Sequence, residues 1–463
     1  MVTIIKNGNI VTGDQVFQGD IKVQDETMIE IGFDIDCPHD KYIDASGCYV
    51  LPGAIDAHTH FDLDTGLTKT ADDFESGSRA ALAGGTTTII DFATQEKGKT
   101  LKEAVAVWDE KSKGKTYCDY GYHMAITDWN ECTKKEMRDM VEHGIPTFKM
   151  YMAYKNTMQV DDAIIYEALR ESNQVGALIG FHCENGYLID ERVKEFIRNG
   201  KTTPYYHMES RLPEVEAEAI YRLLTIGKLA KAPVWIVHLS TKEGLAFVEQ
   251  ARAQGQKVIA ETCPQYLMLT RNCYGTPEGT DFETAKYVMS PPLREKEDQE
   301  ALWKGLQNRS LDFVTTDHCS FHIKGQKDLG KDDFSKIPNG GPGVEDRVLM
   351  LYTYGVCQNR LTIQEMVMLL AGNPAELLGL HNKGKIEVGK DADIVILDPN
   401  STDIFSVATQ TQRVDYNAYE GIKRCGRIET VLLRGKVVVS DHMVLAQPAS
   451  GSFQRREIQP VRM

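Results

Sequence analysis

Hydrophobic and polar positions change their spacing twice along this chain. Residues 1–50 alternate apolar and polar positions between turn residues, as in TIIKNGNIVT and MIEIG, and this period of two predicts short strands. The same alternation returns after residue 384, in GKIEVGKDADIVILDP and IETVLLRGKVVVSDHMVL. We therefore predict a β-sandwich domain that is assembled from both ends of the chain, residues 1–52 and 384–463.

Between these ends, short apolar runs alternate with helical patterns, which is typical of βα units around a parallel sheet. The predicted strands are residues 54–58, 86–91, 120–126, 147–152, 177–183, 234–240, 258–263 and 312–319. The predicted helices include residues 101–113, 133–142, 161–173, 214–230 and 242–253, and the apolar-periodic stretch 363–380 would complete the helix ring. Eight such strands predict an α/β fold of the TIM-barrel type, a (β/α)₈ barrel over residues 53–383.

A doubly wound open sheet is the alternative arrangement of this middle region. It would place a ligand at one switch point of the sheet, whereas the candidate polar residues here follow several separate strands. Three segments with loop-like composition, residues 62–72, 266–286 and 320–343, are long enough to shape an active site.

Charge and cysteine content narrow the class of partner. The net charge of −15 over 463 residues disfavours a nucleic-acid surface or an anionic membrane as partner. Ten cysteines without a C-x-x-C spacing favour reduced thiols in a cytoplasmic protein. No run approaches the ~18 apolar residues of a membrane span, and MVTIIKNGNIV lacks the apolar core of a signal peptide. The net charge says little about the substrate, because a small buried site can have its own local field.

Six polar residues stand at the C-terminal ends of predicted strands, where a barrel gathers its catalytic groups. They are His58, His60, Lys149, His182, His238 and Asp317. His58 and His60 are two positions apart on one strand, so both rings point the same way and can reach one ion. Each histidine alone would more often be a polar core residue, but their placement on several strand ends predicts a metal-dependent hydrolase, because imidazole is a common zinc ligand.

Asp317 and Lys149 each have two interpretations. Asp317 could be the N-cap residue of a helix, and it could also be a metal ligand that acts as a base. Lys149 could form an ion pair with a carboxylate such as Asp317, since an ammonium cannot bind a cation. However, two dications ~3.5–4 Å apart need an anionic bridge. A lysine of lowered pKa can react with CO₂, and the resulting carbamate would offer one oxygen to each ion.

Several motifs together closely resemble the hydantoinase/dihydropyrimidinase family of cyclic amidohydrolases. They are HTH, FKMYMAYK, HCEN, HLS, SPPLR, TTDHCSF and KIPNGGPGVEDR, and the resemblance covers essentially the whole chain. HTH alone is not specific, but the combination is. The resemblance implies hydrolysis of the cyclic amide bond of 5,6-dihydropyrimidines or 5-substituted hydantoins to N-carbamoyl amino acids.

The same resemblance implies a binuclear zinc centre. One ion would be held by His58, His60 and Asp317, and the other by His182 and His238. Carboxylated Lys149 and a hydroxide would bridge the two ions.

The resemblance also assigns contacts to the substrate. Tyr154 would donate a hydrogen bond to the oxyanion, while Ser290 and Asn339 would hold the ring amide, largely through backbone groups. Without the resemblance, they would be a core tyrosine, a serine that begins a proline turn and an asparagine in a tight turn. Asp317 would take the proton of the hydroxide and return it to the leaving ring nitrogen.

Related classes differ in particular residues. Dihydroorotases and allantoinases typically carry an Arg or Asn shortly after His-x-His, whereas HTHFDLDTGLTK contains no Arg, and Asp62 and Asp64 would repel a substrate carboxylate. Non-catalytic scaffold relatives have lost metal ligands, but this chain keeps all six. Relatives of this kind are usually tetramers, so we expect a homotetramer or a dimer, with the polar segment 450–463 docked on a neighbouring chain.

Overall fold

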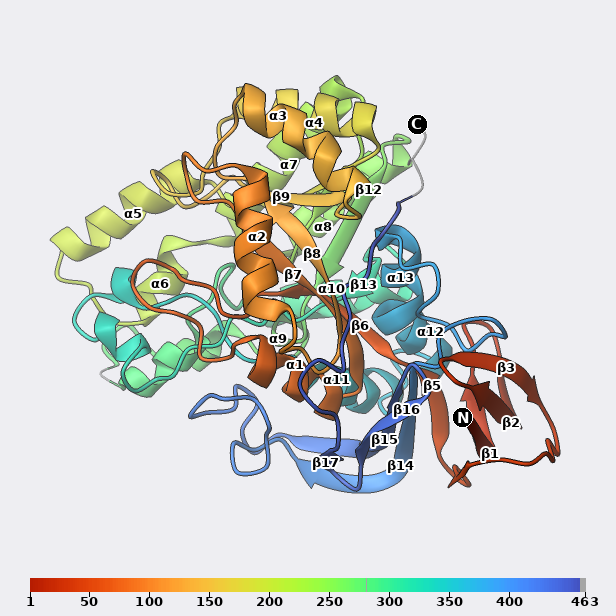
Figure 1. The fold of residues 1–463 in the computed structure, drawn as a ribbon. Helices are drawn as coiled ribbons and strands as arrows, with labels where there is room; N and C mark the ends of the chain where they lie inside the picture. The colour runs from red at the N-terminus through yellow and green to blue at the C-terminus, as the bar shows by residue number, and fades with distance from the viewer. Residues whose placement is uncertain (280, 459–463) are drawn as a thin grey trace.

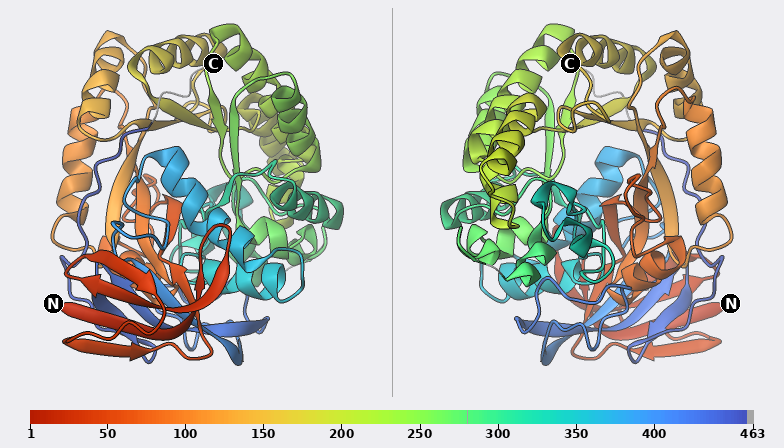
Figure 2. Two further views of the ribbon diagram at one scale, coloured as in Figure 1. Left: turned by 90° about the vertical axis from the view of Figure 1, so that its right-hand side faces the viewer. Right: turned by 90° about the vertical axis from the view of Figure 1, so that its left-hand side faces the viewer.

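The computed structural model of this chain describes residues 1–279 and 281–458. Its larger part is a barrel of parallel strands wrapped by helices, and its smaller part is a sheet domain beside the barrel (Figure 1). The first and last strands of the chain, red and blue in Figure 2, lie together in the smaller part. Residue 280, in the predicted loop 266–286, and residues 459–463, in the predicted C-terminal segment, lie outside the described residues.

Eight parallel strands form the barrel, and their order follows the chain. They are β6 (Ala54–Thr59), β7 (Thr86–Thr94), β8 (Asp119–Ala125), β9 (Thr147–Tyr151), β10 (Leu178–His182), β11 (Val234–Ile236), β12 (Val258–Thr262) and β13 (Phe313–Val314). Repeated βα units produce this order, because each crossover returns the chain to the next position of the sheet. The predicted (β/α)₈ barrel is therefore confirmed, and the reversal of strand order that a doubly wound sheet requires is not found among the described strands.

The first and last barrel strands, β6 and β13, meet through few backbone contacts. Beyond their ends, the amide of His60 donates to the carbonyl of His318 at 2.8 Å. Arg347 is fully buried and donates to the carbonyls of Ile55 and Val314 at 2.9 and 2.7 Å. The guanidinium therefore satisfies carbonyls that a longer last strand would have paired.

Helices cover the outside of the barrel (Figures 1 and 2). The α-helices are α1 (Phe74–Ala83), α2 (Leu101–Ser112), α3 (Glu131–Glu142), α4 (Asp162–Val175), α5 (Gly186–Arg198), α6 (Tyr205–Ser210), α7 (Pro213–Ala230), α8 (Lys242–Ala253), α9 (Pro264–Met268), α10 (Lys296–Gln307), α11 (Arg347–Leu351), α12 (Ile363–Val367) and α13 (Asn373–Leu378). The 3₁₀ helices are η1 (Arg271–Tyr274), η2 (Phe282–Tyr287), η3 (Lys327–Gly330) and η4 (Phe334–Lys336), and the π-helical turns are η5 (Tyr352–Val356) and η6 (Met368–Gly372). The five shorter predicted helices correspond to α2, α3, α4, α7 and α8.

Two barrel strands end earlier than predicted. β11 and β13 stop well before the ends of the predicted segments 234–240 and 312–319. Both strands end early because His238 and Asp317 have left-handed backbones, with φ angles of 40° and 53°. An extended strand cannot continue through a left-handed residue. The chain therefore turns at both positions.

The smaller domain is one mixed sheet of nine strands, in the order β17-β16-β15-β14-β5-β1-β2-β3 with β4 beside β1. Its strands are β1 (Val2–Val11), β2 (Val16–Gln24), β3 (Thr27–Gly32), β4 (Lys41–Asp44), β5 (Tyr49–Pro52), β14 (Ile394–Ile404), β15 (Lys423–Leu433), β16 (Lys436–Ser440) and β17 (Met443–Val444). Ile10 and Val50 share a hydrophobic core with Ile394 and Leu432. The predicted domain from both termini is confirmed, with hydrogen bonds that join its strands into one continuous sheet.

After β17 the chain leaves the sheet domain and runs back along the barrel (Figure 2). Arg456 is 2% exposed and donates to the carbonyl of Tyr122 and, at 2.7 Å, to the hydroxyl of Thr147, the first residue of β9. Ile458 is also buried there. Residues 451–458 therefore pack on their own barrel, and the expected docking of the C-terminal segment on a neighbouring chain stays a prediction.

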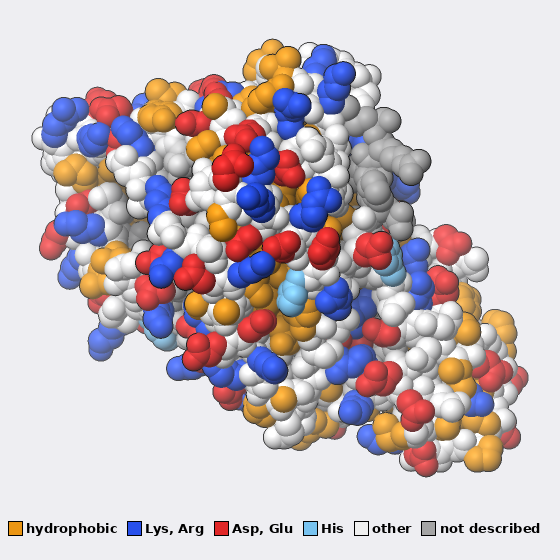
Figure 3. Space-filling model, turned by 45° about the horizontal axis from the view of Figure 1, so that its top comes forward, with side chains coloured by type: hydrophobic (Ala, Val, Ile, Leu, Met, Phe, Trp, Pro, Cys, Tyr) orange, Lys and Arg blue, Asp and Glu red, His pale blue; other side chains and the backbone are white. Residues whose placement is uncertain are grey.

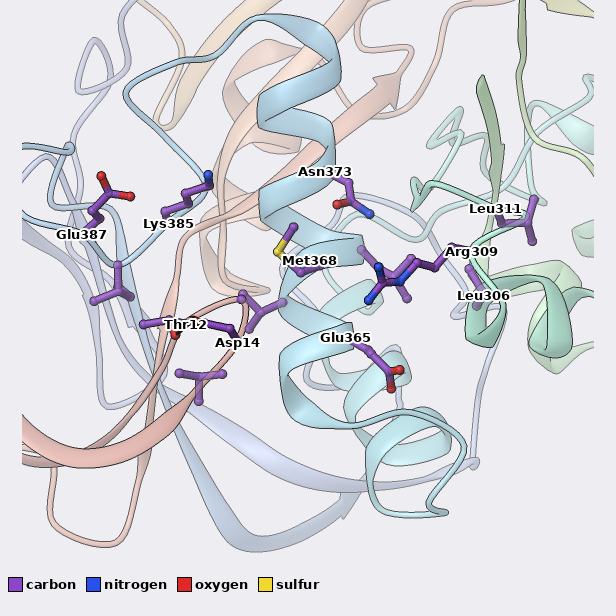
Figure 4. Close-up of a pocket in the computed structure, with 16 residues that line it drawn as sticks. Thr12, Asp14, Leu306, Arg309, Leu311, Glu365, Met368, Asn373, Lys385 and Glu387 are labelled. Atoms are coloured by element: carbon purple, nitrogen blue, oxygen red, sulfur yellow. Dashed lines mark hydrogen bonds between the residues drawn. The ribbon is translucent and has the colours of Figure 1, made fainter. Parts of the chain in front are cut away.

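A cavity of about 540 Å³ lies where the two domains meet (Figure 4). The π turn η6 interrupts the predicted helix 363–380 beside this cavity. Its residue Met368 packs on Gly13 of the sheet domain so closely that a Cβ at Gly13 would lie 2.7 Å from the sulfur. Arg309 and Glu365 bring opposite charges to the lining, so the cavity carries no single sign of charge.

The molecular surface mixes charges of both signs. On the face shown in Figure 3, Lys and Arg side chains lie among Asp and Glu side chains. Within the described part of the chain, no helix combines the length and the apolar character needed to cross a membrane.

Candidate metal centre

The predicted metal ligands converge at the C-terminal end of the barrel strands. They come from β6 and the residue after it (His58, His60), β9 (Lys149), β10 (His182) and the turns after β11 (His238) and β13 (Asp317). Five of these side chains are buried, whereas the Asp317 side chain keeps 15% of its surface exposed. Asp317 therefore lies on the side from which solvent and a small molecule can reach the group.

Asp317 forms one group with two histidines. The Nε2 atoms of His58 and His60 lie 3.1 and 3.2 Å from the same Oδ1 atom of Asp317, and the three residues can offer ligand atoms within 4.8 Å of one another. Burial alone would raise the pKa of Asp317, but the charge of His58 and hydrogen bonds from both rings hold it well below its usual range. An ionised carboxylate beside two imidazoles is a suitable ligand set for a divalent ion.

His182 and His238 form a second pair of ligands. His182 Nδ1 and His238 Nε2 face each other at 3.0 Å. Burial lowers the pKa of both rings, well below the usual value for His238, which favours the neutral imidazole that can bind a metal ion. The ring centroids of His58 and His238 are 5.4 Å apart, which places this pair directly beside the first group.

Lys149 lies among these ligands. Its Nζ is 2.8 Å from His58 Nε2 and 4.3 Å from the centre of the Phe92 ring. Burial lowers the pKa of Lys149, although Asp317 and Glu261 act in the opposite direction. Among the described residues, Lys149 forms no ion pair with Asp317, so the alternative interpretation of this lysine has no direct contact to support it.

Two buried carboxylates that we did not predict orient the histidines. Glu261 Oε1 lies 2.5 Å from His58 Nδ1, and Glu184 Oε2 lies 2.7 Å from His182 Nε2. A carboxylate beside the outer ring nitrogen favours a proton there, and the inner nitrogen can then serve as a ligand atom. Burial raises the pKa of Glu184, but the charge of Arg211, 2.6 Å away, together with the hydrogen bond and charge of His182, outweighs burial and lowers that pKa to about 2.

The sequence contained a signal for each carboxylate. Glu184 follows His182 by two positions in HCEN, the spacing that puts two side chains on the same side of an extended chain. Glu261 is a charged residue inside the otherwise apolar strand run VIAET, where an unpaired charge would be costly.

Tyr154 lies beside the second pair of ligands. It has a left-handed backbone, with φ of 65°, and its ring centre is 5.0 Å from that of His182. Burial raises the pKa of its phenol, so the hydroxyl stays protonated and can donate a hydrogen bond. The nearby hydroxyl of Ser290 acts in the opposite direction and lowers the pKa of the Tyr154 phenol. Among the described residues, this buried hydroxyl has no hydrogen-bond partner of good geometry.

The segments that carry Ser290 and Asn339 are direct neighbours. The amide of Gly340 donates to the carbonyl of Val288 at 3.0 Å. Ser290 is 6% exposed, and Asn339 is half-buried. The fold therefore brings both predicted substrate contacts to adjacent segments and places Ser290 near Tyr154.

His318, the residue after Asp317, is held by other groups. Its Nε2 lies 3.0 Å from Asp72 Oδ2, and its Nδ1 accepts from the amides of Gly343 and Val344 at 3.1 and 3.2 Å. Because both ring nitrogens have partners, His318 is not placed to serve the metal centre.

Comparison with known proteins agrees with this geometry. Residues 49–438 match the amidohydrolase family, and the chain belongs to this family. It is 44% identical over 458 residues to a D-hydantoinase of Geobacillus stearothermophilus, covering 98% of this chain and 97% of the relative. It is 43% identical to a D-hydantoinase of Rhizobium radiobacter, covering 98% and 99%. The crystal structure of dihydropyrimidinase from Brevibacillus agri NCHU1002 superimposes with a TM-score of 0.97 at 41% identity, covering 98% of this chain and 99% of that chain.

Proposed function

We propose that this protein is a cyclic amidohydrolase that opens 5-substituted hydantoins and 5,6-dihydropyrimidines to N-carbamoyl amino acids. The observation that carries the proposal is the convergence of the six predicted ligands at one end of the barrel, with buried carboxylates on the outer ring nitrogens of His58 and His182. The names of the relatives, D-hydantoinase and dihydropyrimidinase, support this substrate class at 41–44% identity over nearly the whole chain.

The donor set fits two zinc ions, because imidazoles and a carboxylate are typical zinc ligands. One ion would be held by His58, His60 and Asp317, and the other by His182 and His238. When bound, the two ions would polarise the ring carbonyl and lower the pKa of a water molecule to ~7.

Lys149 would supply the missing negative charge as a carbamate. Its neutral Nζ adds to the carbon of CO₂ and loses a proton, which gives one negative charge shared by two oxygens. The buried position of Nζ, 2.8 Å from His58 Nε2, supports this role, because the group lies directly beside a ligand of the first ion. A bare ammonium there would repel any cation.

Asp317 would move the proton of the reaction. It is ionised, and its exposed edge lies at the open side of the group. It would accept the proton of the attacking water and return it to the ring nitrogen that leaves, a function that typically contributes ~10²–10⁴-fold in rate.

The phenol and the two neighbouring segments would hold the ring. Tyr154 would donate its proton to the oxyanion that forms at the attacked carbonyl, since the raised pKa keeps the hydroxyl protonated. Ser290 and Asn339 would hold the ring amide, largely through backbone groups. The unpaired hydroxyl of Ser290 leaves a buried polar atom available to a ligand.

A turnover comparison tests this proposal against its rivals. We expect metal-replete protein to hydrolyse dihydrouracil and a 5-substituted hydantoin, with the D-hydantoin preferred as the names of the relatives suggest. Turnover of allantoin or dihydroorotate instead would favour another cyclic amidohydrolase. Absence of bound metal and of all four activities would favour a scaffold protein.

The assembly is a separate proposal. We infer that the protein is a homotetramer in solution, with a dimer as the alternative. A cytoplasmic location stays a prediction. Light scattering at micromolar concentration should give a mass near four times that of the 51.9 kDa chain, and a mass near 51.9 kDa would contradict the proposal.

A further inference from the structure

Lys327 is a buried lysine outside the metal centre. It is the first residue of η3, and its side chain is fully shielded from solvent. Its ammonium donates to the backbone carbonyls of Val288 and Pro338, each at 3.0 Å. Burial lowers the pKa of Lys327 to about 7, and within the described residues no carboxylate pairs with it. Burying a lysine amine whose hydrogen-bond partners are two carbonyls and no carboxylate is costly, so local stability is a weak explanation for it.

The two carbonyls belong to the segments that carry the proposed ring contacts. Val288 precedes Ser290 by two positions, and Pro338 directly precedes Asn339. The carbonyl of Val288 also accepts from the amide of Gly340, so these segments touch each other as well as the lysine. A single ammonium therefore joins both segments at the positions next to their proposed substrate contacts.

The turn that carries Lys327 is itself held from two sides. The amides of Ile323 and Lys324 donate to the Asp415 carboxylate of the sheet domain at 2.8 and 3.1 Å. The side chain of Gln326 donates to Thr68 Oγ1, in the loop 62–72, at 2.9 Å. The ammonium thus extends from a fixed turn.

We propose that Lys327 is a positioning residue that sets the separation of the Ser290 and Asn339 segments and so aligns the groups that hold the substrate ring. This inference rests on the proposed function, because it needs both segments to contact the ring.

The metal centre does not depend on this lysine. The carboxylates of Glu261 and Glu184 hold His58 and His182, and neither contacts Lys327. Loss of the ammonium should therefore weaken ring binding and leave the metal content unchanged. A purely structural lysine would instead lower the melting temperature without a selective change in KM.

The test compares Lys327→Met, which keeps the length of the side chain without its donors, with Lys327→Gln, which keeps an N–H donor. Lys331→Met is the matched control, because Lys331 lies at the end of the same short helix with an exposed side chain. Each metal-loaded variant is measured for KM and kcat with dihydrouracil and a 5-substituted hydantoin, for metal content and for melting temperature.

We expect kcat/KM of Lys327→Met to fall by ~10–100-fold, mostly through KM, with wild-type metal content. Lys327→Gln should recover part of this loss, and Lys331→Met should match the wild type. An unchanged KM in Lys327→Met, a loss of metal, or failure of both Lys327 variants to fold would each overturn the inference in favour of a structural role. A wild type that opens neither ring would refute the proposed function itself, whereas an active wild type with an unchanged Lys327→Met refutes only this inference.

Discussion

Buried charged and polar groups have different kinds of partners at the two ends of the barrel. At the N-terminal end, Lys383 forms ion pairs with Asp119, Asp391 and Asp393 at 2.8, 3.1 and 2.7 Å, and Arg456 donates to several acceptors. At the C-terminal end, by contrast, the ring nitrogens of His182 and His238 face each other. The ammonium of Lys383 at one end has carboxylate partners within the chain, whereas the other end gathers ring nitrogens that can bind a further ligand.

Left-handed backbones occur at both ends of the barrel, with Lys231 and Arg309 in the turns before β11 and β13, and those at the C-terminal end include candidate site residues. Tyr154, His238 and Asp317 all have left-handed backbones at the C-terminal end, and each such residue costs on the order of 1–3 kcal/mol. The chain tolerates this cost where side chains must be aimed at a ligand. The comparison teaches that the same eight strands can serve stability at one end and chemistry at the other.

Lys149→Ala should give the largest change, because it removes the proposed bridge between both ions. We expect the protein to bind less metal and to lose ~10³-fold or more in kcat, since metal stabilisation is worth several kcal/mol and each 1.36 kcal/mol is tenfold in rate. Metal analysis and steady-state kinetics measure both effects. Added short carboxylic acids should restore some activity, and full activity of the variant would contradict the bridging role.

Asp317→Asn separates proton transfer from ligand binding. The amide keeps one ligating oxygen but cannot accept the proton, so we expect much of the metal to stay while kcat falls by ~10²–10⁴-fold. Tyr154→Phe is the control at the same end, because it removes an oxyanion donor worth roughly 10²–10³-fold without touching a ligand. If Asp317→Asn stayed fast with full metal content, another group would have to move the proton.

Glu261→Gln should have a smaller effect that acts through His58. The amide no longer favours the proton on His58 Nδ1, so we expect metal affinity to fall by ~10–100-fold, as is typical for partners of this kind. Competition with a chelator measures the affinity. Glu184→Gln should weaken the other site through His182, and an unchanged affinity in both variants would show that the histidines do not need these carboxylates.

Arg456→Met tests the opposite end and should change stability alone. It leaves the carbonyls of Tyr122 and Leu378 without this donor, and an unsatisfied buried group costs about 1–3 kcal/mol. Urea unfolding should show this loss, while kcat/KM stays within about twofold of the wild type, as expected for a residue at the stability end of the barrel. A large loss of activity in the folded variant would contradict the proposal that the N-terminal end of the barrel serves stability and not catalysis.

Local patterns were enough to predict the barrel, the sheet domain from both termini and the six residues that converge. Alternation with a period of two, helical periodicity and polar residues at strand ends are all features of short segments, and a regular βα order permits few topologies. The family resemblance of motifs such as FKMYMAYK and TTDHCSF added the proposed roles of Lys149 and Asp317. These roles stay predictions until the variants above are measured.

The remaining features depend on contacts between distant parts of the chain. Glu261 meets His58 across 203 positions, and Arg347 reaches Ile55 across 292. The C-terminal segment likewise packs on its own barrel only because Arg456 finds Tyr122, 334 positions away. A side chain acquires such partners only when the barrel closes, because burial then forces each polar group to find a donor or an acceptor nearby. No local pattern records which distant residue that will be, so these contacts were decided by the tertiary structure.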